Sequence, residues 1–230
     1  MSEKSYVRFF VDGQGADIES TALPFDSLCL GIGLFETVLV LSGRPVFFQR
    51  HLARMAASSR DLDIASQTDI ECIFEAALLK ASEYHFPRAR MRISVFKGDG
   101  IAPCAAVITL AQAARAPESI SLAKSSLVRN KRCGLAAHKT VDYLECILAR
   151  REAAMNGHYD SIMLDSDGYI AETSTANIFL FSGGRFVTPA TGSILPGIVR
   201  GWVIEKASEL AVPIENAALP ADIEDSCESA

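Results

Sequence analysis

HKTVDYLECILARREA, the stretch His138–Ala153, contains the residue around which the fold and the chemistry of this chain can be organised. Lys139 stands near its start, and apolar residues then recur at helical spacing. This periodicity predicts a helix over Lys139–Asn156, closed by Gly157. Tyr143 comes four residues after Lys139, so it is expected one helical turn further on and on the same face.

Two shorter stretches follow, separated by strand and turn signals. AETSTANIF carries Glu172, 33 positions after Lys139, and ILPGIVR carries Gly197, which is predicted to open a last helix over Gly197–Leu210. Taken singly, a lysine or a glutamate is usually a solvated surface charge, and Pro-Gly is ordinary punctuation. Together, an amine that can form a Schiff base, a carboxylate and a helix N-terminus are the groups that pyridoxal 5'-phosphate needs.

The rest of the chain alternates helix and strand patterns in two halves. The first half is predicted to contain the strand Tyr6–Val11, a hairpin from Leu34–Leu41 through Ser42–Gly43 to Pro45–Phe48, helices Arg50–Leu62 and Asp69–Tyr84, and strands Arg90–Phe96 and Ala105–Leu110. The second half is predicted to add strands Ile120–Ala123, Ser161–Leu164, Tyr169–Glu172, Ala176–Phe181 and Arg185–Thr188. The pattern indicates an α+β fold with antiparallel pairing, divided into a small α/β domain over 1–112, a linker over 113–119 and a larger cofactor-binding domain over 120–230.

Composition excludes several classes of protein. The 230 residues are 49% hydrophobic and 22% charged, with a net charge of -6 and no basic tract, so a nucleic-acid partner is not expected. The six cysteines include no CxxC pair, which argues against a zinc or redox motif, and no metal site is expected. The N-terminus lacks a signal-peptide pattern, and no apolar run is long enough to span a membrane. We therefore expect a cytoplasmic protein that acts on a small molecule.

Four ordered blocks make the chain similar to a known family. They are GIGLFETVLVLSGRPVFFQRHLARM (Gly31–Met55), KTVDYLECILARREA, GYIAETSTANIF (Gly168–Phe179) and TPATGSILPGIVR (Thr188–Arg200). From about residue 6 to its end the sequence resembles the class IV aminotransferases, the fold-type IV pyridoxal-phosphate enzymes. These include branched-chain aminotransferases, D-amino acid transaminases and aminodeoxychorismate lyases. The resemblance implies a two-domain fold-type IV architecture.

The resemblance also implies roles for individual residues. Lys139 would bind the cofactor aldehyde and, once displaced, move protons at the substrate carbon, and Glu172 would pair with the pyridinium nitrogen. Tyr143 would lie near the cofactor's phenolic oxygen, although it can also be a core tyrosine. The implied phosphate ligands are Arg54 and the helix N-terminus formed by Gly197, Ile198 and Val199. The implied substrate residues are Phe35, Arg92 and Lys97, while Asn177 and His51 are expected to support the structure.

The sequence departs from the family pattern at several positions. Val199 replaces a common threonine and removes a hydroxyl donor to the phosphate. Lys97 replaces an arginine and lacks the bidentate fork that suits a carboxylate. Arg92 and Lys97 are an odd number of residues apart, so on one strand they are expected to face opposite sides. The sequence stops at ADIEDSCESA, where family members usually continue, so either the chain is short or part of the cofactor cup is missing.

The first block favours a 4-amino-4-deoxychorismate lyase, which would form 4-aminobenzoate and pyruvate in folate synthesis. The alternatives are a branched-chain or D-amino acid aminotransferase, and a relative that keeps the scaffold without catalysis. The resemblance implies a homodimer whose active sites lie near the subunit interface. An apolar stretch at Phe25, Leu28, Cys29 and Leu30, in a segment that reads as a loop, could serve this contact or cover the chain's own core.

Overall fold

The computed structural model describes residues 8–11, 16–18, 24–98, 104–190, 192 and 194–222. The chain divides into two compact units, Met1–Ala116 with Lys139–Asp142, and Pro117–His138 with Tyr143–Ala230. The mixture of helices and sheets confirms the predicted α+β class. Part of the predicted strand Tyr6–Val11, its turn at Asp12–Gly13 and the last residues of the sequence lie outside the described residues.

The first unit is built on a six-stranded sheet in the order β2-β1-β6-β5-β3-β4. The strands are β1 (Arg8–Val11), β2 (Ala16–Ile18), β3 (Gly33–Leu41), β4 (Arg44–Pro45), β5 (Arg88–Lys97) and β6 (Cys104–Gln112). The predicted hairpin is present between β3 and β4, and both turn residues have positive φ, 47° at Ser42 and 77° at Gly43. Such a turn matches the twist of the two strands. One pairing differs from the antiparallel expectation, because β1 runs parallel to β6.

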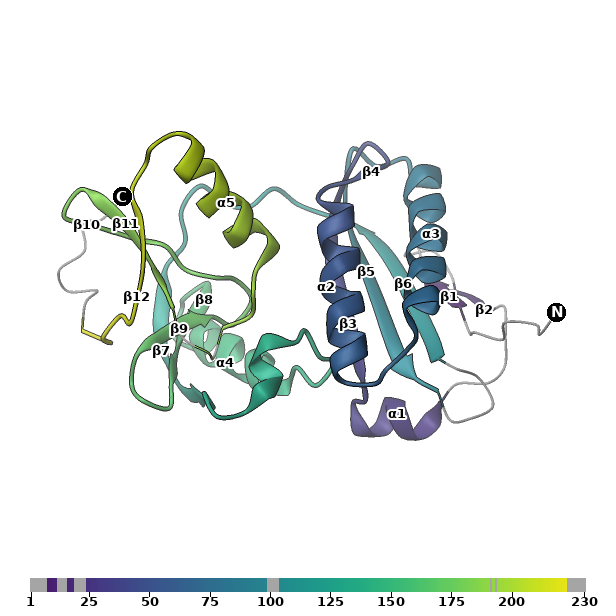
Figure 1. Ribbon diagram of the computed structural model, residues 1–230, viewed down its shortest axis with the longest axis horizontal. Helices are drawn as coiled ribbons and strands as arrows, with labels where there is room; N and C mark the ends of the chain where they lie inside the picture. The colour runs from purple at the N-terminus through teal and green to yellow at the C-terminus, as the bar shows by residue number, and fades with distance from the viewer. Residues whose placement is uncertain are drawn as a thin grey trace. The chain divides into compact units, whose positions relative to one another are not determined.

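Two helices cover one face of this sheet (Figure 1). They are α2 (Phe48–Asp61) and α3 (Gln67–Glu83), and the side chain of Ser66 caps α3 by accepting a hydrogen bond from the Asp69 backbone N–H. The core between them is apolar and includes Leu34, Val38, Phe74, Met91 and Ile93. A short helix, α1 (Phe25–Leu30), stands where the sequence reads as a loop, so that expectation is wrong.

The second unit contains two three-stranded sheets, β7-β8-β9 and β10-β11-β12. Their strands are β7 (Leu122–Arg129), β8 (Asp160–Asp165), β9 (Ile170–Thr173), β10 (Leu180–Ser182), β11 (Arg185–Pro189) and β12 (Ile214–Ala217). The helices are the 3-10 helix η1 (Gly134–Ala137), α4 (Leu144–Met155) and α5 (Ile198–Glu209). β7–β8 and β11–β12 are parallel pairs, which again corrects the expectation of antiparallel pairing.

Two local predictions need correction. The helix predicted over Lys139–Asn156 begins only at Leu144, because the residues before Tyr143 pair with β3 instead. Tyr143 is the N-cap of α4 and therefore does not lie one helical turn from Lys139. The strand predicted over Ala176–Phe181 is present only from Leu180, since the preceding residues form a turn around the Thr173 hydroxyl.

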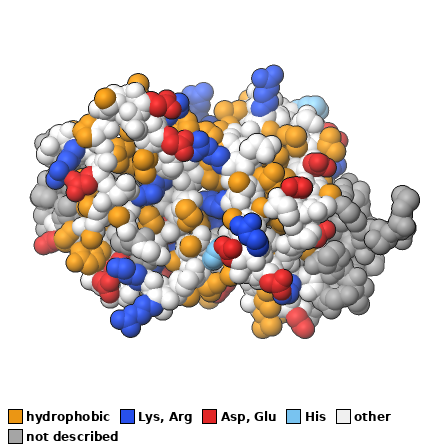
Figure 2. All heavy atoms as spheres, in the orientation of Figure 1, with side chains coloured by type: hydrophobic (Ala, Val, Ile, Leu, Met, Phe, Trp, Pro, Cys, Tyr) orange, Lys and Arg blue, Asp and Glu red, His pale blue; other side chains and the backbone are white. Residues whose placement is uncertain are grey.

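The described surface mixes charges of both signs with apolar side chains. Figure 2 shows Lys and Arg scattered among Asp, Glu and hydrophobic groups on one face. Among the described residues, no helix combines the length and the apolarity required to cross a membrane.

Candidate active site

Lys139 is held in an extended segment against the start of β3. Its carbonyl oxygen accepts a hydrogen bond from the Phe35 N–H at 2.8 Å, and the Val141 N–H donates to the Gly33 carbonyl at 3.0 Å. Gly33 is required here because a Cβ at this position would lie 2.6 Å from the Val95 carbonyl oxygen of the neighbouring strand. Pairing with a sheet strand fixes the backbone of Lys139 more firmly than a loop would.

Phe35 carries two cationic neighbours. Its ring is buried, with 3% exposure. The Lys139 amine lies 4.6 Å from the ring centroid, and the Arg92 guanidinium carbon lies 3.7 Å from the same centroid. Arg92 Nε also donates to Ser94 Oγ at 3.2 Å. An aromatic face attracts cations, so the Phe35 ring contacts both the amine of Lys139 and the guanidinium of Arg92.

Lys97 belongs to a different contact. Its amine donates to Asp63 Oδ2 at 2.6 Å, and this ion pair is exposed. The pairing with Lys97 lowers the pKa of the Asp63 carboxyl. Of the three substrate residues implied by the resemblance, Phe35 and Arg92 are in contact, while Lys97 is directed to Asp63.

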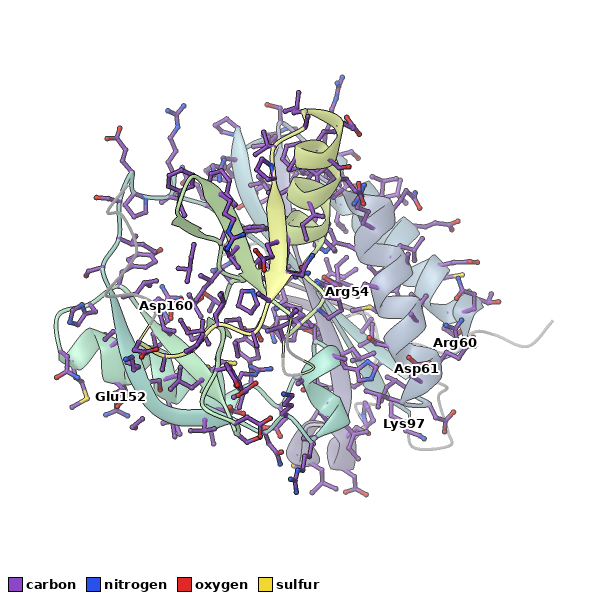
Figure 3. The ribbon with its side chains drawn as sticks, turned by 60° about the vertical axis from the view of Figure 1, so that its left-hand side comes forward. Arg54, Arg60, Asp61, Lys97, Glu152 and Asp160 are labelled. Carbon is purple, nitrogen blue, oxygen red and sulfur yellow. The ribbon has the colours of Figure 1, made fainter. Side chains whose placement is uncertain are left out.

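Glu36 is a buried acid that orients Arg54. Its carboxylate is 1% exposed and accepts hydrogen bonds from Arg54 Nε at 2.7 Å, from Arg54 Nη2 at 2.6 Å and from His51 Nδ1 at 2.7 Å. Burial alone would raise the pKa of Glu36, but the bonds from His51 and Arg54 outweigh it, and the pKa lies below its ordinary value. Arg54, labelled in Figure 3, belongs to α2. Its two hydrogen bonds to Glu36 on β3 fix the orientation of its guanidinium.

Glu172, at the end of β9, is buried and surrounded by donors. Its Oε2 accepts hydrogen bonds from Asn177 Nδ2 at 3.0 Å and from the Leu195 backbone N–H at 3.2 Å. Arg129 Nη2 lies 3.4 Å from Oε1, and Arg129 Nη1 donates to Cys146 Sγ. These partners favour the ionised carboxylate, which can accept a hydrogen bond from a protonated ring nitrogen.

Tyr143 lies close to this carboxylate. Its hydroxyl donates to the Ser174 carbonyl oxygen at 2.9 Å. Burial, with contributions from Cys146 and Glu172, raises the pKa of Tyr143, so the phenol stays protonated at neutral pH. With its single proton directed to Ser174, the Tyr143 oxygen can accept a further hydrogen bond but cannot donate one.

The N-terminus of α5 adjoins the Glu172 contacts. Gly197 is its N-cap, and the Gly201 N–H donates to the Gly197 carbonyl, so the N–H groups of Ile198 and Val199 precede the first bond of the helix. Such N–H groups suit a phosphate. A Cβ on Gly197 would overlap the Asn177 carboxamide oxygen. Glycine is therefore needed for α5 to begin beside the residue that holds Glu172.

Sequence reasoning missed several residues of these arrangements. No sequence pattern marks Arg129. The strand predicted over Ile120–Ala123 ends before this arginine, whereas β7 extends to it. Glu36 had a signal, since an acid in the apolar strand GLFETVLV requires a buried partner. The Leu195 N–H is a backbone group without any sequence signature.

Comparison with known proteins gives a family match along most of the chain. The family model for amino-transferase class IV matches residues 33–229. The aminodeoxychorismate lyase of Bacillus subtilis (strain 168) is 28% identical over 222 residues, covering 90% of this chain and 75% of that protein. The branched-chain-amino-acid aminotransferase of Escherichia coli (strain K12) is also 28% identical, over 214 residues, 84% of this chain and 69% of that protein.

A solved structure shows the same fold. An aminotransferase from Brucella abortus, crystallised with the cofactor PLP, superposes with a TM-score of 0.78 at 22% identity, over 94% of this chain and 83% of that one. At this identity the likeness concerns the fold alone.

Proposed function

Because the chain belongs to the class IV aminotransferases and is accordingly a pyridoxal-phosphate-dependent lyase or aminotransferase, we propose that it is a 4-amino-4-deoxychorismate lyase forming 4-aminobenzoate and pyruvate. The first sequence block favours this activity. The Bacillus subtilis lyase also covers slightly more of this chain than the Escherichia coli aminotransferase does, at equal identity.

The donor set of the second unit fits pyridoxal phosphate. A buried carboxylate with three donors around it, Glu172, suits a protonated pyridine nitrogen. Tyr143 would offer its oxygen to the cofactor's phenolic group, and the N–H groups at Gly197–Val199 suit the phosphate. Val199 contributes its backbone only, since its side chain has no hydroxyl. When bound, the cofactor supplies an electron sink for bonds broken at the substrate's amine-bearing carbon.

In the first unit, Lys139 would bind the cofactor aldehyde and then act on the substrate. Its amine would move a proton at the α-carbon in either a lyase or an aminotransferase reaction. Arg54, whose guanidinium is oriented by Glu36, would bind phosphate by charge-assisted hydrogen bonds.

The observation that supports an amino-acid-like substrate with a carboxylate is the shared contact of Lys139 and Arg92 with Phe35. A guanidinium that shares the Phe35 ring with the reacting amine can bind a carboxylate of the substrate in the bidentate manner that arginine favours. Lys97 stays a prediction as a substrate residue, and its ion pair with Asp63 makes Arg92 the stronger candidate.

Single-turnover assays test the proposal. The reconstituted protein is mixed separately with aminodeoxychorismate, D-alanine and L-leucine, and Lys139→Ala serves as the inactive control. We expect 4-aminobenzoate and pyruvate from the first substrate and little product from the others. Turnover with L-leucine alone would overturn the proposal in favour of a branched-chain aminotransferase, which the match to the Escherichia coli enzyme supports. Turnover with D-alanine alone would favour the D-amino acid alternative, and no turnover would favour a non-catalytic relative.

We further propose a cytoplasmic homodimer. On α1, Leu30 is 72% exposed and Leu28 is 36% exposed, which is costly for apolar side chains in water unless a partner covers them. Light scattering at micromolar concentration checks this part of the proposal. A particle of 24.8 kDa would mean a monomer and contradict it.

A further inference from the structure

Asp160 is a buried carboxylate outside the groups assigned above. It opens β8, is labelled in Figure 3 and is 3% exposed. Its Oδ1 accepts hydrogen bonds from the Ser161 backbone N–H at 2.8 Å and from the Ser174 hydroxyl. Its Oδ2 accepts a hydrogen bond from the Thr175 hydroxyl at 3.0 Å. A buried carboxylate is costly unless it is hydrogen-bonded, and two of these three bonds, from Ser174 and Thr175, tie Asp160 to the turn that follows β9.

The turn in question lies between Glu172 and Asn177. Thr173 closes it, because its N–H donates to the Ala176 carbonyl at 2.7 Å and its hydroxyl oxygen accepts from the Ala176 N–H. Asn177, at one end, donates to the Glu172 carboxylate. Ser174, inside the turn, accepts the hydrogen bond of the Tyr143 hydroxyl through its carbonyl. A fixed turn therefore fixes the Tyr143 hydroxyl as well.

We propose that Asp160 is a positioning residue that holds Ser174 in place. The Ser174 carbonyl then accepts the hydrogen bond of the Tyr143 hydroxyl. The Tyr143 oxygen would thereby be available to the bound cofactor as a hydrogen-bond acceptor. The inference rests on the proposed role of Tyr143. Hydrogen bonds to a charged acceptor are stronger than those between neutral groups, which is why a carboxylate suits this position. Without it, the Ser174 and Thr175 hydroxyls lose their shared acceptor, and the Ser174 backbone keeps only its N–H bond to the Ser161 carbonyl at 3.2 Å, so the carbonyl that accepts from Tyr143 is held less firmly.

Asp165 provides a matched control at the other end of β8. It is also buried, at 1% exposure, and its Oδ1 accepts hydrogen bonds from the Asp167 and Tyr169 backbone N–H groups, each at 3.0 Å. Its second oxygen lies 3.9 Å from the Lys131 amine. Asp165 thus performs the same kind of structural task for the β8–β9 turn.

A double-mutant cycle separates positioning from plain stabilisation. Pyridoxamine 5'-phosphate is titrated calorimetrically into cofactor-free protein, since this probe carries an amine and cannot bond covalently to Lys139. We expect Asp160→Ala to weaken binding about tenfold when Tyr143 is present, and less than about twofold in the Tyr143→Phe background, because both residues belong to one hydrogen-bond network through Ser174. Asp165→Ala should change Kd by the same factor in both backgrounds.

Thr175→Val is measured in parallel because Thr175 is exposed and the change leaves the carboxylate in place. It removes one of the three bonds to Asp160 and should weaken binding about threefold, again only when Tyr143 is present. If Asp160→Ala does not fold, this variant alone tests whether the hydrogen bonds of Asp160 affect cofactor binding through Tyr143. Losses that are equal in both backgrounds would overturn the inference while leaving the proposed function standing. Failure of the unaltered protein to bind the probe would overturn both.

Discussion

Glu36→Gln tests the buried ion pair that orients Arg54. The change keeps the size of the side chain but replaces one carboxylate oxygen by an NH2 group. The Glu36 carboxylate accepts three hydrogen bonds, two of them from Arg54 and one from His51. In either orientation of the glutamine amide, at least one of these donors would face another donor. The Arg54 charge, only 13% exposed, would also lose its counter-charge.

The size of the effect follows from this burial. Removing one partner of a buried ion pair costs about 3–5 kcal/mol, because the remaining charge is left uncompensated. Arg54 keeps some contact with solvent, and His51 can change its tautomer, so we expect the lower end, about 3 kcal/mol. For a chain of this size such a loss lowers the midpoint of thermal unfolding by roughly 6–12 °C.

The assay is differential scanning calorimetry of the cofactor-free protein at pH 7. Lys97→Met is the control, since it removes an exposed ion pair in the same unit and should leave the midpoint nearly unchanged. A midpoint for Glu36→Gln within about 2 °C of the unaltered protein would refute the reasoning. It would mean that water stabilises the Arg54 charge as well as the Glu36 carboxylate does.

Three further outcomes follow from the contacts. The folded-state pKa of Glu36 lies below its ordinary 4.5. Its contribution to stability is therefore complete above pH 4.5 and is lost as the pH falls through the folded-state pKa. The midpoints of unfolding of the unaltered protein and Glu36→Gln should converge in acid. Gly197→Ala should displace Asn177 and weaken pyridoxamine 5'-phosphate binding measured by calorimetry, whereas Gly201→Ala, with open space around its Cβ, should leave binding unchanged and stabilise α5 by about 0.5–1 kcal/mol. Arg92→Met should raise KM for the acidic substrate about 10- to 100-fold through the loss of a charged hydrogen bond, and an unchanged KM in steady-state assays would remove Arg92 from the substrate site.

Local signals in the sequence were sufficient for much of the fold. The Ser42–Gly43 turn, the apolar stripe of α3 and the start of α5 beside Gly197 each follow from a residue preference that acts over a few positions. These elements lie within two residues of their predicted bounds because neighbouring residues alone decide them.

The predictions failed where contacts distant in sequence decide the structure. Lys139 follows a helical pattern, yet pairing of Leu34 with Thr140 keeps this segment extended. The parallel pairs β1–β6 and β7–β8 join strands far apart in the chain. Asp160 and Arg129 become informative only when folding brings them to Ser174 and Glu172, so no spacing rule could have selected them.

The central claim is that Lys139 holds pyridoxal phosphate. The direct measurement is an absorbance spectrum of the protein reconstituted with excess cofactor, followed by borohydride treatment, proteolysis and mass spectrometry. The account predicts a yellow protein whose colour is lost on reduction, with the cofactor's mass permanently attached to the peptide that contains Lys139 and absent from Lys139→Ala. A colourless protein after reconstitution, or a label on another lysine, would contradict it.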